Sequence, residues 1–448
     1  MIVPVPFVGG VPMPIVQIVD VIGVADGVMP AAVAVLVIMP LMGHVPARLA
    51  LVVVVGVQPV QMPVVRVVDV VTVRHLGMAA RGAVDVVVDG VFVVERGHGA
   101  HLRWGGRGDP LRLAPDAPLM ALWEPCRCLS DLREGDPMKA ISYRSYGGPE
   151  VLEYGEVRDP KVGPDSVLVK VRAAAVNPVD WKCREGYLDA ALDPVFPVIP
   201  GWDVAGVVVQ PGASVPEFAV GDEVIGYVRE DFLSRGTFAE YVAAPVRTLA
   251  RKPRNLTFEE AAGLPLAGLT AYQVIVKALE VTEGDVVLVH AAAGGVGSLA
   301  VQLARHAGAR VIGTASERNH DYLRELGAEP VTYGDGLVDR VRALAPEGVD
   351  AAFDTVGGDA LKASAELLAP GGRLASIADG GVIGLGGHYC FVRPDAADLR
   401  RLTELAEQDV LTVHVDETFP LERAAEAHRR NAEGRTRGKI VVTVEWTD

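Results

Sequence analysis

The sequence predicts an α/β protein over residues 138–448, in which a β-rich part is combined with a parallel sheet covered by helices. Two observations support this prediction. Short alternating strand patterns fill the first part of that segment, and from residue 286 onward buried strands alternate with amphipathic helices at βαβ spacing. A third observation sets its limit: residues 1–137 differ in composition and are not expected to form a folded domain.

The first 137 residues contain no Lys, no Asn and no Tyr, a single Thr (Thr72), and a large excess of Val. No basic stretch precedes the apolar start, as a secretory signal would require, and Pro and Asp residues interrupt each apolar run before it could span a membrane. Lys, Asn and Tyr have AT-rich codons, so their joint absence is typical of translated GC-rich upstream DNA. We expect a mis-assigned start, with Met138 as the natural one; a disordered extension is the alternative.

Charge and cysteine content limit the partners and the compartment. The 448 residues have a formal net charge of −15, which disfavours nucleic acid or an anionic membrane as partner. Four scattered Cys are too few for a disulfide framework, so we expect a cytoplasmic protein. Cys126 and Cys128 lack the spacing and the second ligand pair of a zinc site.

The β-rich part begins at Met138 and is punctuated by Gly and Pro turns. Its pattern predicts an irregular, antiparallel, barrel-like domain without a helical run. The expected strands are Lys139–Tyr143, Val167–Arg172, Val204–Gln210, Val224–Val228 and Thr237–Ala243.

The character of the chain changes at Thr257, which forms a capping box with Glu260 and predicts a helix start. A long helical stretch, interrupted near Pro265, is expected up to Glu280. The alternation that follows predicts a parallel sheet with helices on both faces. Strands are expected over Val286–His290, Arg310–Thr314, Pro330–Tyr333, Asp350–Asp354 and Gly372–Ile377, with helices over Val296–Ala307, Asn319–Leu326, Val338–Leu344 and Gly358–Leu368. A final strand, helix and strand are expected over Val410–Phe419, Leu421–Arg430 and Gly438–Val444.

The most informative motif lies between the first of these strands and its helix, in the segment Val286 to Gly308. After the buried strand the chain reads His-Ala-Ala-Ala-Gly-Gly-Val-Gly, and Gly308 follows the helix as a C-cap. A strand–glycine turn–helix unit directs free backbone N–H groups and the positive end of the helix dipole at one point. We therefore predict a dinucleotide pyrophosphate site here; a purely structural turn is the alternative.

The tip of the second strand selects the nucleotide. NAD sites usually place an acidic residue there to bind the ribose 2′-OH, whereas this chain has Ala315 at that position. The neighbouring Ser316 and Arg318 offer a hydroxyl and a guanidinium that suit a 2′-phosphate. We expect NADPH as cofactor, with Glu317 pointing into solvent or capping the next helix.

Several ordered motifs resemble those of the medium-chain dehydrogenase/reductases, and in particular the quinone oxidoreductases similar to zeta-crystallin. The resemblance covers Met138 to Asp448. It implies a GroES-like catalytic domain over residues 138–260 and 391–448, with a Rossmann domain inserted at 261–390. The motifs are Asn177-Pro-Val-Asp180, Pro200-Gly-Trp-Asp-Val-Ala-Gly206, Leu266-Ala-Gly-Leu-Thr270, Ala291–Gly297 and Asp354-Thr-Val-Gly-Gly358.

The same resemblance argues against a metal. Where zinc enzymes of this superfamily have a Cys, a His and a second Cys, this chain has Asn177, Trp202 and Leu266. None of these side chains is a zinc ligand. We therefore expect neither catalytic nor structural zinc.

The resemblance also assigns roles to individual residues. Asn177 and Asp180 would line the cleft floor, although fixing the local turn is an equally good interpretation. Tyr187, Tyr272, Tyr389 and Asp180 are proton-donor candidates by residue type alone, and Asn177, Asp180 and Tyr187 are our catalytic candidates. The predicted cofactor-binding residues are Thr270, Ala293, Gly294, Gly295, Val296, Gly297, Ser316, Arg318, Tyr333, Ile377, Phe391, Val392 and Lys439.

Without a metal to polarise an alcohol, reduction of an acceptor that is already electrophilic is the easier chemistry. We expect an NADPH-dependent reductase of quinones or α,β-unsaturated carbonyl compounds that acts as a homodimer. Two alternatives stay open: an enoyl-thioester reductase, and an NADPH-binding structural or sensing protein without turnover.

Overall fold

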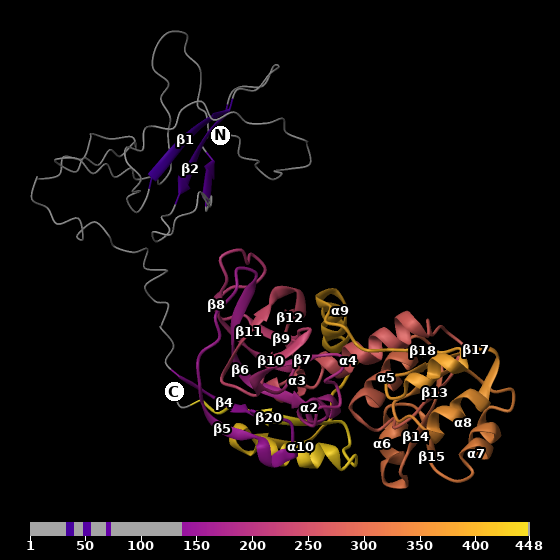
Figure 1. Ribbon diagram of the computed structural model, residues 1–448. Helices are drawn as coiled ribbons and strands as arrows, with labels where there is room; N and C mark the ends of the chain where they lie inside the picture. Colours follow the sequence, from indigo (N-terminus) through magenta and orange to yellow (C-terminus); the bar gives the residue numbers. More distant parts are fainter. Residues whose placement is uncertain (1–32, 40–47, 55–68, 73–136, 447–448) are drawn as a thin grey trace, which may run out of the picture. The chain divides into compact units, whose positions relative to one another are not determined.

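The computed structural model describes residues 33–39, 48–54, 69–72 and 137–446 (Figure 1). The chain divides into two units, Met1–Asp131 and Leu132–Asp448. In the first unit three antiparallel strands are described: β1 (Val33–Met39), β2 (Arg48–Val54) and β3 (Asp69–Thr72). The expectations about the start site and the foldedness of residues 1–137 concern a segment that lies mostly outside the described residues, and they stay predictions.

The second unit opens with the β-rich domain, built on a seven-stranded sheet of order β12-β9-β8-β6-β20-β19, with β11 also paired to β6. The last two strands come from the C-terminal end of the chain, so its first and last parts form one sheet. The expected strands are confirmed, with the last shifted by a few residues. The sheet strands are β6 (Ser166–Val176), β8 (Asp203–Pro211), β9 (Glu223–Tyr227), β11 (Tyr241–Pro245), β12 (Leu249–Arg251), β19 (Val415–Pro420) and β20 (Lys439–Thr443).

Two features of this domain correct the expectation of an all-antiparallel barrel without helix. β19 and β20 are parallel, because the helix α10 (Ala424–Ala432) carries the chain back between them. β7 (Asp193–Ile199) and β10 (Phe232–Arg235) also pair in parallel. The short helix α2 (Pro178–Arg184) was missed, although Pro178 at its first position and the Asn177–Asp180 capping box are start signals. An antiparallel pair completes the domain: β4 (Met138–Ser142) with β5 (Glu153–Val157).

The helical connection after Thr257 agrees with the prediction. The Thr257 hydroxyl accepts from the Glu260 N–H at 3.2 Å, and the Glu260 carboxylate accepts from the Thr257 N–H at 2.9 Å. The break near Pro265 is also confirmed, because Pro has no N–H to continue the helix. The segments are α3 (Phe258–Ala262), α4 (Pro265–Tyr272) and the π-helical turn η4 (Gln273–Ala278).

The nucleotide-binding half is a six-stranded parallel sheet of order β15-β14-β13-β16-β17-β18. Counted along the chain this is 3-2-1-4-5-6, the order of dinucleotide-binding folds, and Figure 1 shows it as the orange part of the molecule. The predicted alternation is confirmed with shifts of one to a few residues at the ends. The elements are β13 (Val286–Val289), α5 (Gly295–His306), β14 (Arg310–Ala315), α6 (His320–Glu325), β15 (Glu329–Thr332), α7 (Leu337–Leu344), β16 (Val349–Asp354), α8 (Asp359–Leu367), β17 (Leu368–Ser376) and β18 (His388–Tyr389).

The helix α9 (Ala396–Glu407) was not predicted. Its start signal is Asp395, whose carboxylate accepts from the Ala397 and Asp398 N–H groups. Leu399, Leu402 and Leu405 are buried at helical spacing. The helix connects the nucleotide-binding sheet to β19, and α9 packs beside α4 and β12. Short 3-10 turns complete the chain: η2 (Pro149–Val151), η3 (Val246–Thr248), η5 (Glu317–Asn319), η6 (Gly380–Leu385) and η7 (Leu421–Arg423).

Candidate active site

The glycine turn between β13 and α5 is tightly constrained. A Cβ on Gly297 would lie 2.3 Å from the Ala291 carbonyl oxygen, so only glycine lets the helix start this close to the strand. Ala291 itself has a φ of 45°, and its carbonyl accepts from the Gly294 N–H at 2.9 Å. The turn therefore aims the first N–H groups of the twelve-residue helix α5 into one point, as a pyrophosphate requires.

The start of β20 closes against this turn. The Gly438 N–H donates to the Ala293 carbonyl at 2.9 Å, and Gly294 and Gly438 form an isolated parallel bridge. A Cβ on Gly295 would come within 2.7 Å of Lys439 Cδ. The Lys439 side chain thus lies directly beside the glycine turn, where the resemblance placed it.

From the turn, Lys439 reaches into a buried polar network of the β-rich domain. Its ammonium donates to Asn177 Oδ1 at 2.5 Å and to the Val176 carbonyl at 3.3 Å. The Asn177 amide donates in turn to Asp203 Oδ2 at 2.9 Å, and that carboxylate lies 3.9 Å from the ammonium. Asp203 Oδ1 accepts from the Leu266 N–H at 2.7 Å. All three side chains are at least 95% buried, so both ends of the Asn177 amide are fixed.

Asp180 is the fourth member of this network, because its carboxylate accepts from the Asn177 backbone N–H at 2.7 Å. Burial raises the pKa of Asp180 to about 7 and that of Asp203 to about 6, and the Lys439 ammonium partly offsets both shifts. Burial also lowers the pKa of Lys439. Two carboxyl groups therefore share one cation in a dry environment. Asn177 and Asp180 form the cap of α2, as the local-turn interpretation has it, whereas their place on the floor of a cleft stays a prediction.

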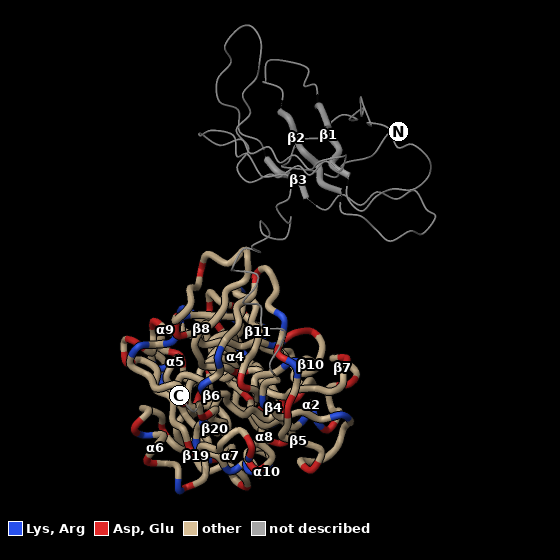
Figure 2. The backbone as a smooth tube through the Cα atoms, turned by 90° about the vertical axis from the view of Figure 1, so that its left-hand side faces the viewer, with Lys and Arg blue, Asp and Glu red and all other residues tan. Residues whose placement is uncertain are grey.

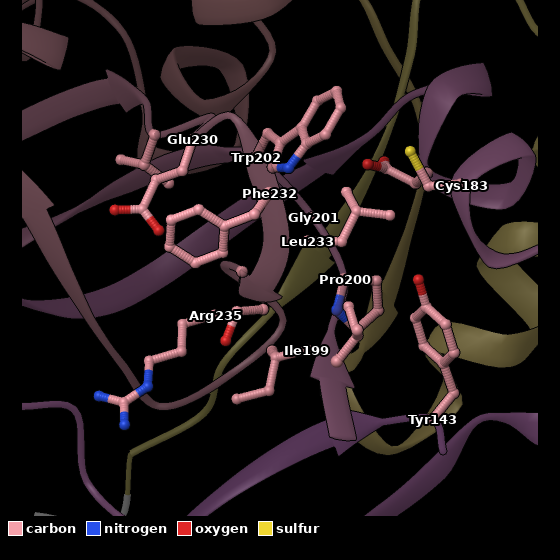
Figure 3. Close-up of a pocket in the computed structure, with 15 residues that line it drawn as sticks. Tyr143, Cys183, Ile199, Pro200, Gly201, Trp202, Glu230, Phe232, Leu233 and Arg235 are labelled. Atoms are coloured by element: carbon pink, nitrogen blue, oxygen red, sulfur yellow. The ribbon is translucent and has the colours of Figure 1, made fainter. Parts of the chain in front are cut away.

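A hollow of about 20 Å³, with room for about one water molecule, opens beside the network (Figure 3). Asp180 and Cys183 line it from α2, and Trp202 lines it from the turn that precedes β8. The Trp202 ring meets the buried Tyr227 ring edge-on at 6.0 Å. The remaining wall is largely apolar and comes from β7 and β10, with Glu230 and Arg235 also lining it: Tyr143, Val198, Ile199, Pro200, Gly201, Val228, Glu230, Phe232, Leu233, Ser234, Arg235 and Gly236.

These residues do not fit a catalytic zinc ion. Asn177 is bonded to an ammonium, Trp202 packs against Tyr227, and Leu266 contributes only its backbone N–H. A buried cation beside Asn177 would also repel a metal ion. Across residues 137–446, no three His, Cys, Asp or Glu side chains are grouped as metal ligands.

Two guanidinium groups, those of Arg318 and Arg437, lie near the tip of β14. Arg318 donates to the Arg435 carbonyl at 2.7 Å, and Arg437 donates to Asn319 Oδ1 at 3.0 Å. Ser316, half-buried, begins the turn, and Glu317 is exposed as expected. The sequence analysis did not assign Arg435 and Arg437 to this site, because they lie more than 110 residues after Arg318 in the chain. The arrangement is rich in donors, as a 2′-phosphate requires.

The other predicted site residues differ in how far their side chains are exposed. Thr270 is buried on α4, and its hydroxyl donates to the Leu266 carbonyl at 2.7 Å. Phe391 is half-exposed, and Arg229, just after β9, lies over its ring at 5.4 Å, so Phe391 faces the β-rich domain. Tyr187 is 71% exposed and contacts the Trp181 ring edge-on. Ile377 and Val392 are half-buried, and Tyr333 is exposed. Their roles stay predictions.

Asp203 is the network residue that the sequence analysis left unassigned. It belongs to the Pro200–Gly206 block, but a lone Asp next to a strand carries no signal of its own. Asp354 is explained as structural: it accepts from the Val356 and Gly357 N–H groups and from the Ser376 hydroxyl. It thereby fixes the turn after β16.

Comparison with known proteins agrees with this geometry. Residues 163–254 match the family "Alcohol dehydrogenase GroES-like domain", and residues 326–442 match "Zinc-binding dehydrogenase". The NADPH-dependent alkenal/one oxidoreductase of Arabidopsis thaliana chloroplasts is 37% identical over 314 residues, which cover 68% of this chain and 79% of that protein. Among solved structures, the quinone oxidoreductase from Coxiella burnetii is 37% identical with a TM-score of 0.63, covering 69% of this chain and 100% of that one. A mycobacterial protein solved with NADPH is 30% identical with a TM-score of 0.61, covering 68% and 99%.

Proposed function

Since the chain belongs to the medium-chain dehydrogenase/reductase superfamily, in its quinone oxidoreductase (zeta-crystallin-like) branch, we propose that it reduces quinones or α,β-unsaturated carbonyl compounds with NADPH and without a metal. The observation that carries the proposal is the Lys439–Asn177–Asp203 network. It lies beside the nucleotide turn and includes Asn177, one of the three residues that stand, by the resemblance, where zinc enzymes of this superfamily have ligands.

The residues of the chain divide the work between them. The turn around Gly294 to Gly297 would hold the pyrophosphate, and Ser316 with Arg318 would hold the 2′-phosphate. When bound, NADPH supplies the hydride. The hollow beside Trp202 would have to widen to admit the flat acceptor, whose binding would exclude water, and the positive charge of Lys439 would favour the negative charge that develops on the acceptor oxygen. Positioning and electrostatics then supply the rate enhancement.

NADPH is preferred to NADH in this proposal because Ala315 leaves the ribose 2′-OH without an acidic partner and Arg318 stands beside it. Two relatives support this preference by name: the oxidoreductase of Arabidopsis thaliana is NADPH-dependent, and the mycobacterial structure contains NADPH. The same names support quinone or enone reduction more than enoyl-thioester reduction or binding without turnover.

We propose a cytoplasmic homodimer that acts on small molecules. In the described part of the chain, none of the helices has the length and apolar character needed to cross a membrane. Acidic and basic residues are interspersed over the enzyme unit (Figure 2), which does not favour a nucleic-acid partner. The short edge strand β18 of the parallel sheet would pair with a second copy, as in relatives of this branch.

Loss of NADPH absorbance with 1,4-benzoquinone and with an enone such as 3-penten-2-one tests the proposal. We expect turnover of at least one acceptor class, and a much lower KM for NADPH than for NADH. An absence of turnover with both classes, despite tight NADPH binding, would overturn the proposal in favour of a binding protein.

A further inference from the structure

Enone reduction needs a proton as well as a hydride, and this inference rests on the proposed function. Hydride addition at the β-carbon leaves an enolate, whose α-carbon must then be protonated. Of the four donors suggested by residue type, Tyr187 is 71% and Tyr389 is 44% exposed. Tyr272 packs into the helical layer with the Lys277 ammonium over its ring. Asp180 is 3% exposed and lines the hollow.

The position of Asp180 is fixed by its helix. It is the third residue of α2, and its carboxylate accepts from the Asn177 N–H, as an N-terminal cap does. This bond uses one carboxyl oxygen. The side chain lies in the lining of the hollow together with Cys183 of the same helix and Trp202. It is therefore held in place beside a hollow that would have to widen before an acceptor could reach the carboxyl group.

The charges around Asp180 favour its protonated form. The nearest cation, Lys439, is already bonded to Asn177 and paired with Asp203. Arg184 is committed to the Gly147 carbonyl, to Glu185 and to His428 of α10. The Asp203 carboxylate of β8 also raises the pKa of Asp180. The remaining titratable groups coupled to Asp180 are Tyr143, just after β4, Cys183, and Tyr227 of β9, and burial raises the pKa of each, so they stay neutral. With no cation of its own, Asp180 holds a proton up to about pH 7.

We propose that Asp180 is the general acid that protonates the α-carbon of an enone acceptor. The hydride forms a C–H bond at the β-carbon, and the π electrons move onto the carbonyl group. The Asp180 O–H bond then breaks as its proton forms the second C–H bond at the α-carbon. The carboxylate that remains takes a proton from water entering the hollow. A quinone needs no such step, because its reduced oxygens are protonated directly by water.

Asp180→Asn tests this role with the fold conserved, because the amide oxygen of Asn can still accept from the Asn177 N–H. General acid catalysis typically contributes about 100-fold or more to a rate. We expect kcat for 3-penten-2-one to fall by about 100-fold, and by at least tenfold more than kcat for 1,4-benzoquinone. Asp222→Asn is the matched control, since Asp222 caps a remote turn through the Ala219 N–H and Arg251. Asp222→Asn should leave both kcat for 3-penten-2-one and kcat for 1,4-benzoquinone unchanged.

Two further measurements separate this role from a structural one. In the wild type, kcat for the enone should fall as the pH rises above about 7, and this dependence should be lost in Asp180→Asn. Infrared spectra of the cofactor-free protein should contain a protonated-carboxyl band at pH 6, to which Asp203 also contributes, and this band should weaken in Asp180→Asn. Equal losses for enone and quinone, or an unchanged band, would overturn the inference. Failure of the proposed function would look different, because the wild type itself would then reduce neither acceptor.

Discussion

Lys439→Met removes the one cation of the buried network while keeping most of the side-chain volume. The change leaves the Asp203 carboxylate, which is 0% exposed, 2.9 Å from an amide donor but without a positive charge. It also leaves Asn177 Oδ1 without its donor. Breaking a buried ion pair by removing one partner costs about 3–5 kcal/mol. The cavity contribution is small because Met is close in size to Lys.

The pH dependence distinguishes this electrostatic cost from a packing defect. Burial holds the pKa of Asp203 at about 6, above its unfolded value, so its contribution to stability is present at low pH and is lost as the pH rises through 6. Without the Lys439 ammonium the pKa of Asp203 rises further, so the protein loses more stability as the pH rises. We expect Lys439→Met to destabilise the protein by about 3 kcal/mol at pH 8, and by less than half of that at pH 5.

The assay is urea unfolding followed by circular dichroism at the two pH values. Lys252→Met is the matched control, because Lys252 is also buried but donates to the Pro253 and Leu256 carbonyls and pairs, at 3.2 Å, with the half-exposed carboxylate of Glu223 and not with a buried one. It should destabilise by a similar amount at both pH values. An equal loss at pH 5 and pH 8 for Lys439→Met would refute the shared-charge account of the network.

Three further predictions follow from the nucleotide half. Gly297→Ala should raise the Kd for NADPH at least tenfold, because its Cβ meets the Ala291 carbonyl; Gly155→Ala, with open space around it, is the control, and normal binding by Gly297→Ala would contradict the turn geometry. Arg318→Ala should raise the KM for NADPH by about tenfold while that for NADH changes less than twofold; equal effects on both would place Arg318 away from the 2′-phosphate. Burial lowers the pKa of His290 to about 4, so the contribution of His290 to stability should fall as the pH drops from 6.5 toward 4. His290→Gln, measured by thermal unfolding, should lose less stability over that range, and an identical loss would count against a buried neutral His290.

The parallel sheet was predictable because its signals are local. A buried Val run such as Val286–Val289 predicts a strand, and an apolar period such as that of α5 predicts a helix, each within a few residues. The glycine turn between them predicts a dinucleotide site. The helix α9 also has local signals, a capping Asp395 and spaced leucines, so it was predictable from the sequence.

The polar network was not predictable from local pattern, because its members are far apart in the sequence. Lys439 meets Asn177 across 262 positions, and Asp203 meets Leu266 across 63. Only the sheet topology, which places β20 beside β6, brings the C-terminal lysine to Asn177. The resemblance identified which ligands were missing, while the structure identifies what replaced them.

The final test follows the hydride itself. The protein is treated with a metal chelator, supplied with NADPH carrying two deuterium atoms at C4 of the nicotinamide, and allowed to reduce 3-penten-2-one, and the product is examined by mass spectrometry and NMR. Our account predicts one deuterium on the β-carbon of the saturated ketone, at a rate that the chelator does not change. A product without deuterium, or activity that the chelator abolishes and Zn²⁺ restores, would contradict it.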